Sequence, residues 1–134
     1  IFACGNVLHV HDLVDYVTEE SKLAGKTAAL YLEDKIKKRE GEIKLVAKDN
    51  VSYIVPHKIT DKLADRKKVD LYLRAKKLLE NTKIVVKDGN KELFTKKEDY
   101  IKPGEMITLA LPEKMIDNLE NSQVEVIIEE GEEE

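Results

Sequence analysis

The chain is poor in cysteine, tryptophan and long apolar runs, and each shortage excludes a class of protein. The one cysteine, Cys4, excludes an internal disulfide, a Cys-x-x-Cys redox pair and a cysteine-rich zinc site within these 134 residues. It also fits a reducing compartment, so a cytoplasmic location is expected. No apolar run approaches the ~20 residues of a membrane-spanning helix. A net charge of −4 argues against a general nucleic-acid binder, which would present a basic face.

Aromatic residues make up only 5% of the chain, so its core must be built from valine, isoleucine and leucine. Apolar residues reach 42%, which is enough for one domain, or for one small domain with an appendage. Charged residues reach 37% and are mostly lysine and glutamate, well above the roughly 25% of an average domain. This enrichment is a hint of a thermophilic source.

The first third of the chain predicts one strand and one long helix. Residues 1–6 begin with an apolar run and are expected to form a strand. Residues 12–39 are expected to form a helix, with Asp12 as its cap, acidic side chains in its early turns and a basic end that Gly41 terminates. Gly25 in mid-helix favours close packing against a neighbour. The predicted inner face carries mostly small side chains: Leu13, Val17, Ala24, Ala28 and Leu32.

From residue 42 the apolar period changes to two, which predicts strands separated by turns. The turn signals include Asp88-Gly89-Asn90 and Lys102-Pro103-Gly104, and Pro112 is placed to open a short helix. Residues 57–68 are expected to form a loop or one helical turn, and the run of glutamates from residue 129 a disordered tail. The side chains predicted to be largely buried are Val51, Leu71, Leu73, Ile84, Val86, Ile107, Leu109 and Val126.

The predicted fold class is therefore α+β: an N-terminal strand and long helix, followed by an all-β sandwich of about seven antiparallel strands. The predicted domains are a strand-plus-helix segment over residues 1–41, a β-sandwich over residues 42–129 and an acidic tail over residues 130–134.

Residues 1–32 carry a specific resemblance. The run Phe2-Ala3-Cys4-Gly5-Asn6, a loop, and a helix with small-x-x-small spacing resemble the last segment of the FAD-binding fold in the pyridine-nucleotide-disulfide oxidoreductase superfamily. There the pattern is apolar-Phe/Tyr-Ala-small-Gly-Asp. Because the chain begins in mid-strand and without methionine, it is expected to be the C-terminal piece of a larger flavoenzyme. The implied cofactors of that full-length protein are FAD and NAD(P), and none is expected in this fragment.

The resemblance also implies roles for individual residues. Gly5 lets the backbone approach the flavin, and Asn6 hydrogen-bonds the ribityl chain in the place where aspartate is commoner. Backbone N–H groups of the first helical turn, near Val14 and at Asp15, Tyr16 and Val17, lie at the N1–C2=O edge of the ring, where a helix N-terminus stabilises the reduced anion.

His9 and His11 allow two interpretations. Loops of the type His-Val-His-Asp are similar to those in a subgroup resembling the NAD-linked flavoprotein partner of glycerol-3-phosphate or amino-acid dehydrogenases. That implies a catalytic histidine, His11 or His9, donating a hydrogen bond or shuttling a proton near the flavin. His9, His11 and Asp12 also look like a metal cluster. Catalytic zinc needs three protein ligands, and His57 is the one further histidine, so no metal is expected.

Three functions therefore stand as alternatives. The leading one is the C-terminal part of an FAD- and NAD(P)-dependent oxidoreductase, inactive alone because the Gly-x-Gly-x-x-Gly cradle is absent. The second is a non-catalytic β-sandwich module for interaction or oligomerisation, and the third a metal-dependent hydrolase fragment. The expected partners are the remainder of its own polypeptide and a second copy or a dehydrogenase subunit, with no nucleic acid and no membrane span.

Overall fold

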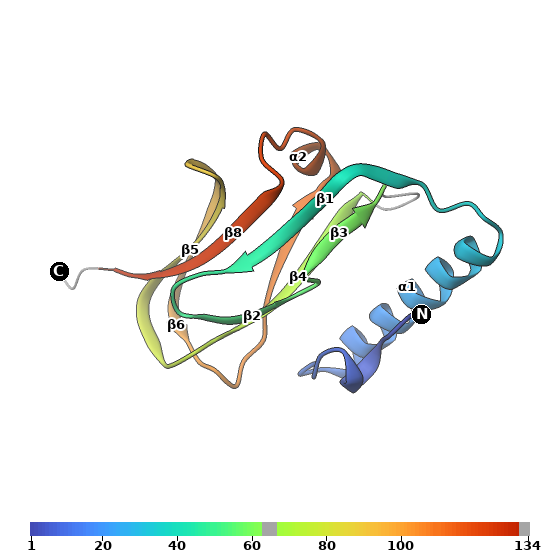
Figure 1. Cartoon of the computed structure of the whole chain (residues 1–134). Helices are drawn as coiled ribbons and strands as arrows, with labels where there is room; N and C mark the ends of the chain where they lie inside the picture. Colours follow the sequence, from blue (N-terminus) through green and yellow to red (C-terminus); the bar gives the residue numbers. More distant parts are fainter. Residues whose placement is uncertain (63–66, 132–134) are drawn as a thin grey trace.

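The computed structural model describes residues 1–62 and 67–131 (Figure 1). The helical elements are the 3-10 turn η1 and the α-helices α1 and α2: η1 Gly5–Val7, α1 Val14–Leu32 and α2 Glu113–Asp117. The strands are β1 Lys38–Ala47, β2 Val51–Val55, β3 Lys58–Asp61, β4 Lys68–Ala75, β5 Leu79–Asp88, β6 Lys91–Ile101, β7 Ile107–Pro112 and β8 Gln123–Glu130. The N-terminal segment with α1 lies to one side of a body made of strands, hereafter the β region (Figure 1).

The β region consists of two sheets around a common core. One sheet has five strands in the order β3-β1-β8-β5-β6, and the other has three in the order β2-β4-β7. The buried apolar cluster draws residues from both sheets, for example Ile84 and Val126 from the first and Leu71 and Leu109 from the second. The prediction of a β-rich α+β chain is confirmed, with eight described strands instead of about seven. The expectation of purely antiparallel pairing is wrong, because β1 and β8 run parallel.

The predicted core is confirmed at almost every position. Seven of the eight side chains predicted to be buried are at most 4% exposed, and Ile107 is half-buried at the start of β7. The alternation is clearest in β4, where Val69, Leu71, Leu73 and Ala75 point into the core. The two predicted turns also form: β5 and β6 pair up to Asp88 opposite Lys91, and the amide of Glu105 donates to the carbonyl of Lys102.

Two predicted irregular segments contain strand. Residues 57–68 include β3, which pairs with β1 through Ile59 opposite Ile43, while residues 63–66 lie outside the described residues. A single buried isoleucine among lysines and aspartates carries too little apolar pattern to predict a strand. The predicted tail begins later than expected, because Glu129 and Glu130 belong to β8 and pair with β5. Residues 132–134 lie outside the described part.

The expected strand over residues 1–6 is not formed. The backbone is extended at Cys4 (φ −154°, ψ 171°), but Gly5 turns to φ +74° and begins η1. A strand requires a hydrogen-bonded neighbour, and no described strand pairs with this segment.

The helix is shorter than predicted at both ends. α1 starts after Leu13, whose side chain provides no cap. Asp12, the predicted cap, instead accepts hydrogen bonds from Arg74 and from the amide of Met106. It ends where Asp34 adopts a left-handed conformation (φ +58°) and the amide of Lys35 donates to the carbonyl of Leu30. Aspartate here takes the place usually held by glycine. Gly41 (φ +83°) instead lies inside β1, where the register with β3 shifts, so the basic run lies outside the helix.

α1 packs loosely on the β region. The predicted inner face is wrong at its ends, since Leu13 and Leu32 are 58% and 84% exposed. A groove of about 1620 Å³ separates the helix from the strands, lined by Leu23 and Ala24 on one side and Ile59 and Val69 on the other. A side chain at Gly25 would meet nothing within 4 Å, so no close packing occurs there.

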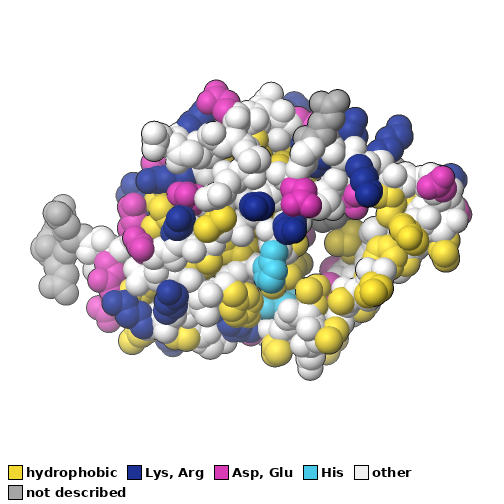
Figure 2. All heavy atoms as spheres, viewed as in Figure 1, with side chains coloured by type: hydrophobic (Ala, Val, Ile, Leu, Met, Phe, Trp, Pro, Cys, Tyr) yellow, Lys and Arg dark blue, Asp and Glu magenta, His cyan; other side chains and the backbone are white. Residues whose placement is uncertain are grey.

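The N-terminal segment exposes several large apolar side chains. Figure 2 shows hydrophobic side chains gathered along α1. Ile1, Val7, Val14 and Leu32 are all at least 77% exposed. None of the described helices combines the length and the apolar character required to cross a bilayer.

Candidate functional site

The histidine loop (residues 9–12) lies on the outer face of the three-stranded sheet. In β4 the core side chains alternate with Tyr72 and Arg74, which point the other way. Tyr53 of β2 is paired with Arg74 across the two strands. Period-two alternation therefore places these three side chains beneath the loop.

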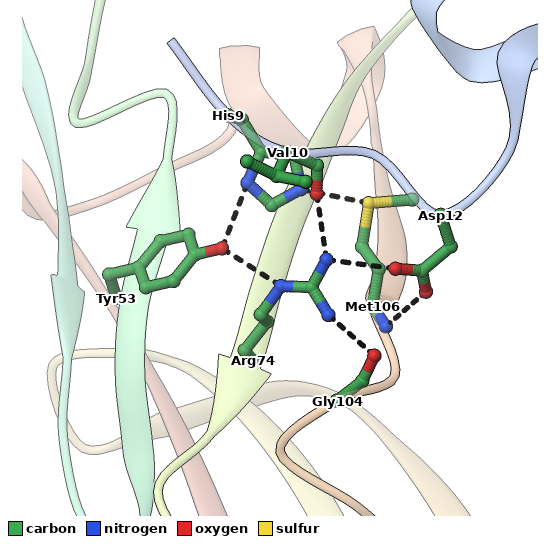
Figure 3. Close-up of polar contacts among 7 residues, drawn as sticks. All are labelled: His9, Val10, Asp12, Tyr53, Arg74, Gly104 and Met106. Carbon is green, nitrogen blue, oxygen red and sulfur yellow. Dashed lines mark hydrogen bonds and ion pairs between the residues drawn. The ribbon is translucent and has the colours of Figure 1, made fainter. Parts of the chain in front are cut away.

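Arg74 joins the loop to the β region through all three of its guanidinium nitrogens (Figure 3). Its Nη2 donates to the carbonyl of Val10 at 2.7 Å and to Oδ1 of Asp12 at 2.9 Å. Its Nη1 donates to the carbonyl of Gly104 at 2.9 Å, and its Nε donates to the hydroxyl of Tyr53 at 3.1 Å. Arg74 thus bonds its cross-strand neighbour Tyr53 and also makes contacts to the loop that the sequence does not predict.

Asp12 is the acidic partner in this cluster. Besides Arg74, it accepts a hydrogen bond from the backbone amide of Met106 at 2.7 Å. That N–H group and the Arg74 guanidinium hold the pKa of Asp12 below its usual value. In return, the hydrogen bond to Asp12 raises the pKa of Arg74.

His9, the first residue of the loop, is buried against the sheet, with 3% of its surface exposed. Its Nδ1 lies 3.0 Å from the Tyr53 hydroxyl, and its Nε2 lies 2.9 Å from the Met106 sulfur. Burial first, and then the nearby His11 and Arg74, lower the pKa of His9, which favours the neutral ring at pH 7. Its ring stacks on that of Tyr72 with 5.7 Å between centroids.

His11 faces the helix instead. Its Nε2 lies 2.6 Å from Oε2 of Glu20. The other carboxylate oxygen of Glu20 accepts a hydrogen bond from the backbone amide of Gly5 at 2.6 Å. The side chains of His11 and Glu20 are 0% and 8% exposed. Nδ1 of His11 is buried without a hydrogen-bond partner among the described residues. Glu20 therefore ties η1, the histidine loop and α1 together.

The residues expected to contact flavin are more exposed than the buried histidine rings. Asn6 and Asp15 are exposed, Tyr16 and Val17 are half-buried in the first turns of α1, and a side chain at Gly5 would meet nothing within 4 Å. The ring of Tyr16 stacks on His11 with centroids 6.1 Å apart. The site residues thus form two layers: the two histidine rings face inward, and the more exposed layer contains Asn6 and Asp15, with Gly5, Tyr16 and Val17 half-buried.

Sequence reasoning missed four members of the site: Glu20, Tyr53, Tyr72 and Met106. A pairing of residues 51–55 with residues 71–75 would have placed Tyr53 beside Arg74. The contact of Met106 with His9 spans 97 residues and leaves no local pattern in the sequence.

Within the described residues, no three or more His, Cys, Asp or Glu side chains gather in a way that would hold a metal ion. His9 and His11 are close, with 4.7 Å between ring centroids, but their nitrogens at Nδ1 and Nε2 of His9 and Nε2 of His11 contact tyrosine, methionine and glutamate.

Comparison of the chain with protein-family models, with curated protein sequences and with solved structures gives no match.

Proposed function

We propose that this chain is the C-terminal part of an FAD- and NAD(P)-dependent oxidoreductase, in which residues 1–32 complete the flavin site and the β region is an appended β-sandwich. The basis is the resemblance of these residues to the last segment of an FAD-binding fold. The observation that carries the proposal is that exposed Asn6 follows Gly5, whose left-handed conformation favours glycine and where a side chain would meet nothing within 4 Å. Asp15, in the first turn of α1, is exposed as well.

The geometry supports a division of roles. Asn6 is exposed and offers an amide to a ribityl hydroxyl, and Asp15, Tyr16 and Val17 lie in the first turns of α1, whose dipole favours a reduced, anionic flavin. Both histidine rings are turned toward the protein in this structure. We therefore assign His9 and His11 to holding the loop, and a proton shuttle would need the loop to open.

The apolar surface of α1 and its flanks is the second support. In the proposed protein, the remainder of the polypeptide covers this surface and supplies the cradle for the cofactor phosphates. An interaction or oligomerisation module is the alternative, and the same exposed surface, which includes Val14 and Leu32, favours it.

One substitution tests the assignment of the flavin site. In the protein translated from the complete open reading frame, Asn6→Leu should lower flavin retention, because a buried ribityl hydroxyl without its partner costs about 1–3 kcal/mol. Asn6→Asp, the residue commoner in the resembling family, is the matched control and should keep the flavin. The measurements are the flavin-to-protein absorbance ratio and the rate of NAD(P)H oxidation. Full flavin and normal activity in Asn6→Leu would reject the assignment of the flavin site to this segment. A complete wild-type protein without flavin would reject the oxidoreductase and leave the interaction module.

A further inference from the structure

The contacts of Arg74 join three segments that are distant in the chain. One guanidinium binds the loop at Val10 and Asp12, the turn before β7 at Gly104, and β2 at Tyr53. We propose that Arg74 and Tyr53 are positioning residues through which the β region fixes the histidine loop and the start of α1. The consequence of this for a bound flavin rests on the function proposed above.

The arrangement depends on the shape of the guanidinium and not only on its charge. Arg74 donates through Nε, Nη1 and Nη2 in different directions at the same time, with its side chain 15% exposed. A lysine carries one nitrogen on a flexible stem and would reach at most part of this set. Replacing Arg74 by lysine therefore keeps the charge near Asp12 but removes the simultaneous contacts.

Tyr53 sets the direction of the hydrogen bonds. Arginine has no acceptor, so Arg74 Nε donates to the Tyr53 oxygen, and the Tyr53 proton is directed to Nδ1 of His9. The neutral His9 ring then carries its proton on Nε2, next to the sulfur of Met106. The chain from Arg74 through Tyr53 to His9 therefore fixes both the orientation and the tautomer of the ring.

The same cluster reaches the helix. Asp12 immediately precedes Leu13, which occupies the N-cap position of α1, and its two oxygens accept hydrogen bonds from Arg74 and the amide of Met106. The loop leading into α1 is thus held at both Val10 and Asp12. Because α1 otherwise packs loosely across a groove, the direction of its N-terminus depends on these contacts and on the Glu20 contacts to Gly5 and His11.

Hydrogen exchange on the 134-residue chain tests the positioning role without any flavin. Arg74→Lys removes the hydrogen bonds of the charged guanidinium that hold the loop. Two amides should then exchange roughly tenfold faster or more: that of Met106, which donates to Asp12, and that of His9, which donates to the carbonyl of Gly5. The amide of Ile128 in β8, which donates to the carbonyl of Asp49, should be unchanged.

Arg39→Lys is the matched control. Arg39 has a similarly buried side chain, 14% exposed, and forms an ion pair with Asp117 at 3.1 Å. Its replacement should leave exchange in the loop unchanged. Equal loop exchange in Arg74→Lys and Arg39→Lys would overturn the proposal. If Arg74→Lys does not fold, Tyr53→Phe removes only the bridging hydroxyl, and an unchanged nitrogen chemical shift at His9 Nδ1 in that variant would overturn the role of Tyr53.

The consequence for flavin is measured separately in the protein from the complete reading frame. There Arg74→Lys should retain flavin but shift its midpoint potential to more negative values, because a displaced helix N-terminus stabilises the reduced anion less. Arg39→Lys should leave the potential unchanged. A complete protein without flavin would reject the proposed function, while the exchange experiment would still decide the positioning role. A bound flavin with an unshifted potential in a loosened Arg74→Lys variant would overturn the link to flavin alone.

Discussion

At the scale of single residues, His9 combines burial with a cationic neighbour. Arg74 and His11 lie near its ring, and Glu20 and Asp12 oppose their effect without cancelling it, so that the pKa of His9 is below its ordinary value of 6.5. Protonation would also place a second donor against the Tyr53 hydroxyl, whose proton is directed at Nδ1 in the neutral form. The neutral ring is therefore the form that fits the cluster.

The first prediction is that the chain loses stability on mild acidification. The unfolded chain binds a proton at His9 more readily than the folded chain does. Stability from this group is therefore complete above about pH 6.5 and falls as the pH is lowered toward the folded pKa. Thermal midpoints measured by circular dichroism between about pH 5 and pH 8 should show this loss, and His9→Asn should reduce it.

His57→Asn is the control, because the His57 side chain is exposed. That variant should keep the pH dependence of the wild-type chain. An identical dependence in His9→Asn would show that His9 does not carry the effect.

At the scale of elements, the sequence predicts what short-range patterns determine. Period-two alternation predicted β4 and its buried leucines, and Asp88-Gly89-Asn90 predicted the turn between β5 and β6. The predictions fail where a contact between residues distant in the chain determines the local structure. Asp12 looks like a helix cap, but Arg74 and Met106 bind its carboxylate more than 60 residues away in the chain. β3 forms because Ile59 meets Ile43.

The candidate site follows the same division. Its outward layer, Gly5 and Asn6, is contiguous in sequence and is the part to which the resemblance assigns a role, which stays a prediction. Its inward layer combines His9 with Tyr53, Arg74 and Met106, which only the folded chain brings together. The residues that hold the loop come from different strands, and their spacing in the sequence follows no regular pattern. This layer therefore cannot be predicted unless the order of the strands is known.

Asp88, at the end of β5, also binds backbone amides of a segment that is distant in the chain. It is 2% exposed, and its two oxygens accept the backbone amides of Glu120 and Asn121 at 2.8 and 3.1 Å, in the connection between α2 and β8. Burial alone would raise the pKa of Asp88, but these N–H groups outweigh it and the pKa is lowered. The carboxylate therefore stabilises the fold above its unfolded pKa of 3.8, and this contribution is lost in stronger acid.

The second prediction is that Asp88→Ala destabilises the chain by about 1–3 kcal/mol at neutral pH, because two amides lose their acceptor. Asp88→Asn keeps one carbonyl oxygen and should cost less. Asp99→Ala, at an exposed position in β6, should stay within about 0.5 kcal/mol of the wild type. Urea unfolding at neutral pH measures all three. A loss for Asp88→Ala no larger than that for Asp99→Ala would contradict the role of Asp88.

At the scale of the whole molecule, a well-packed β region carries a poorly covered N-terminal segment. The core side chains of β5 and β8, such as Ile84 and Ile128, are fully buried, whereas α1 buries only Glu20 along its length. Because most of the stability of a protein helix comes from packing of its apolar face, α1 gains little from packing on the β region. The hydrogen bonds of Arg74 and Glu20 hold this segment in place without covering its apolar side chains.

The last prediction is that the 134-residue chain self-associates through this apolar surface, whereas the complete protein proposed above covers it and does not. Leu13 and Leu78 form a matched pair, 58% and 57% exposed, the first at the start of α1 and the second in the β region between β4 and β5. Burying a leucine is worth about 1.5–3 kcal/mol, so Leu13→Gln should raise the dissociation constant of the dimer by roughly tenfold or more. Leu78→Gln should leave it unchanged. Sedimentation velocity over a series of concentrations measures both. A wild-type chain that stays monomeric at the highest concentration, or an equal effect of the two substitutions, would show that the N-terminal segment is not an association surface.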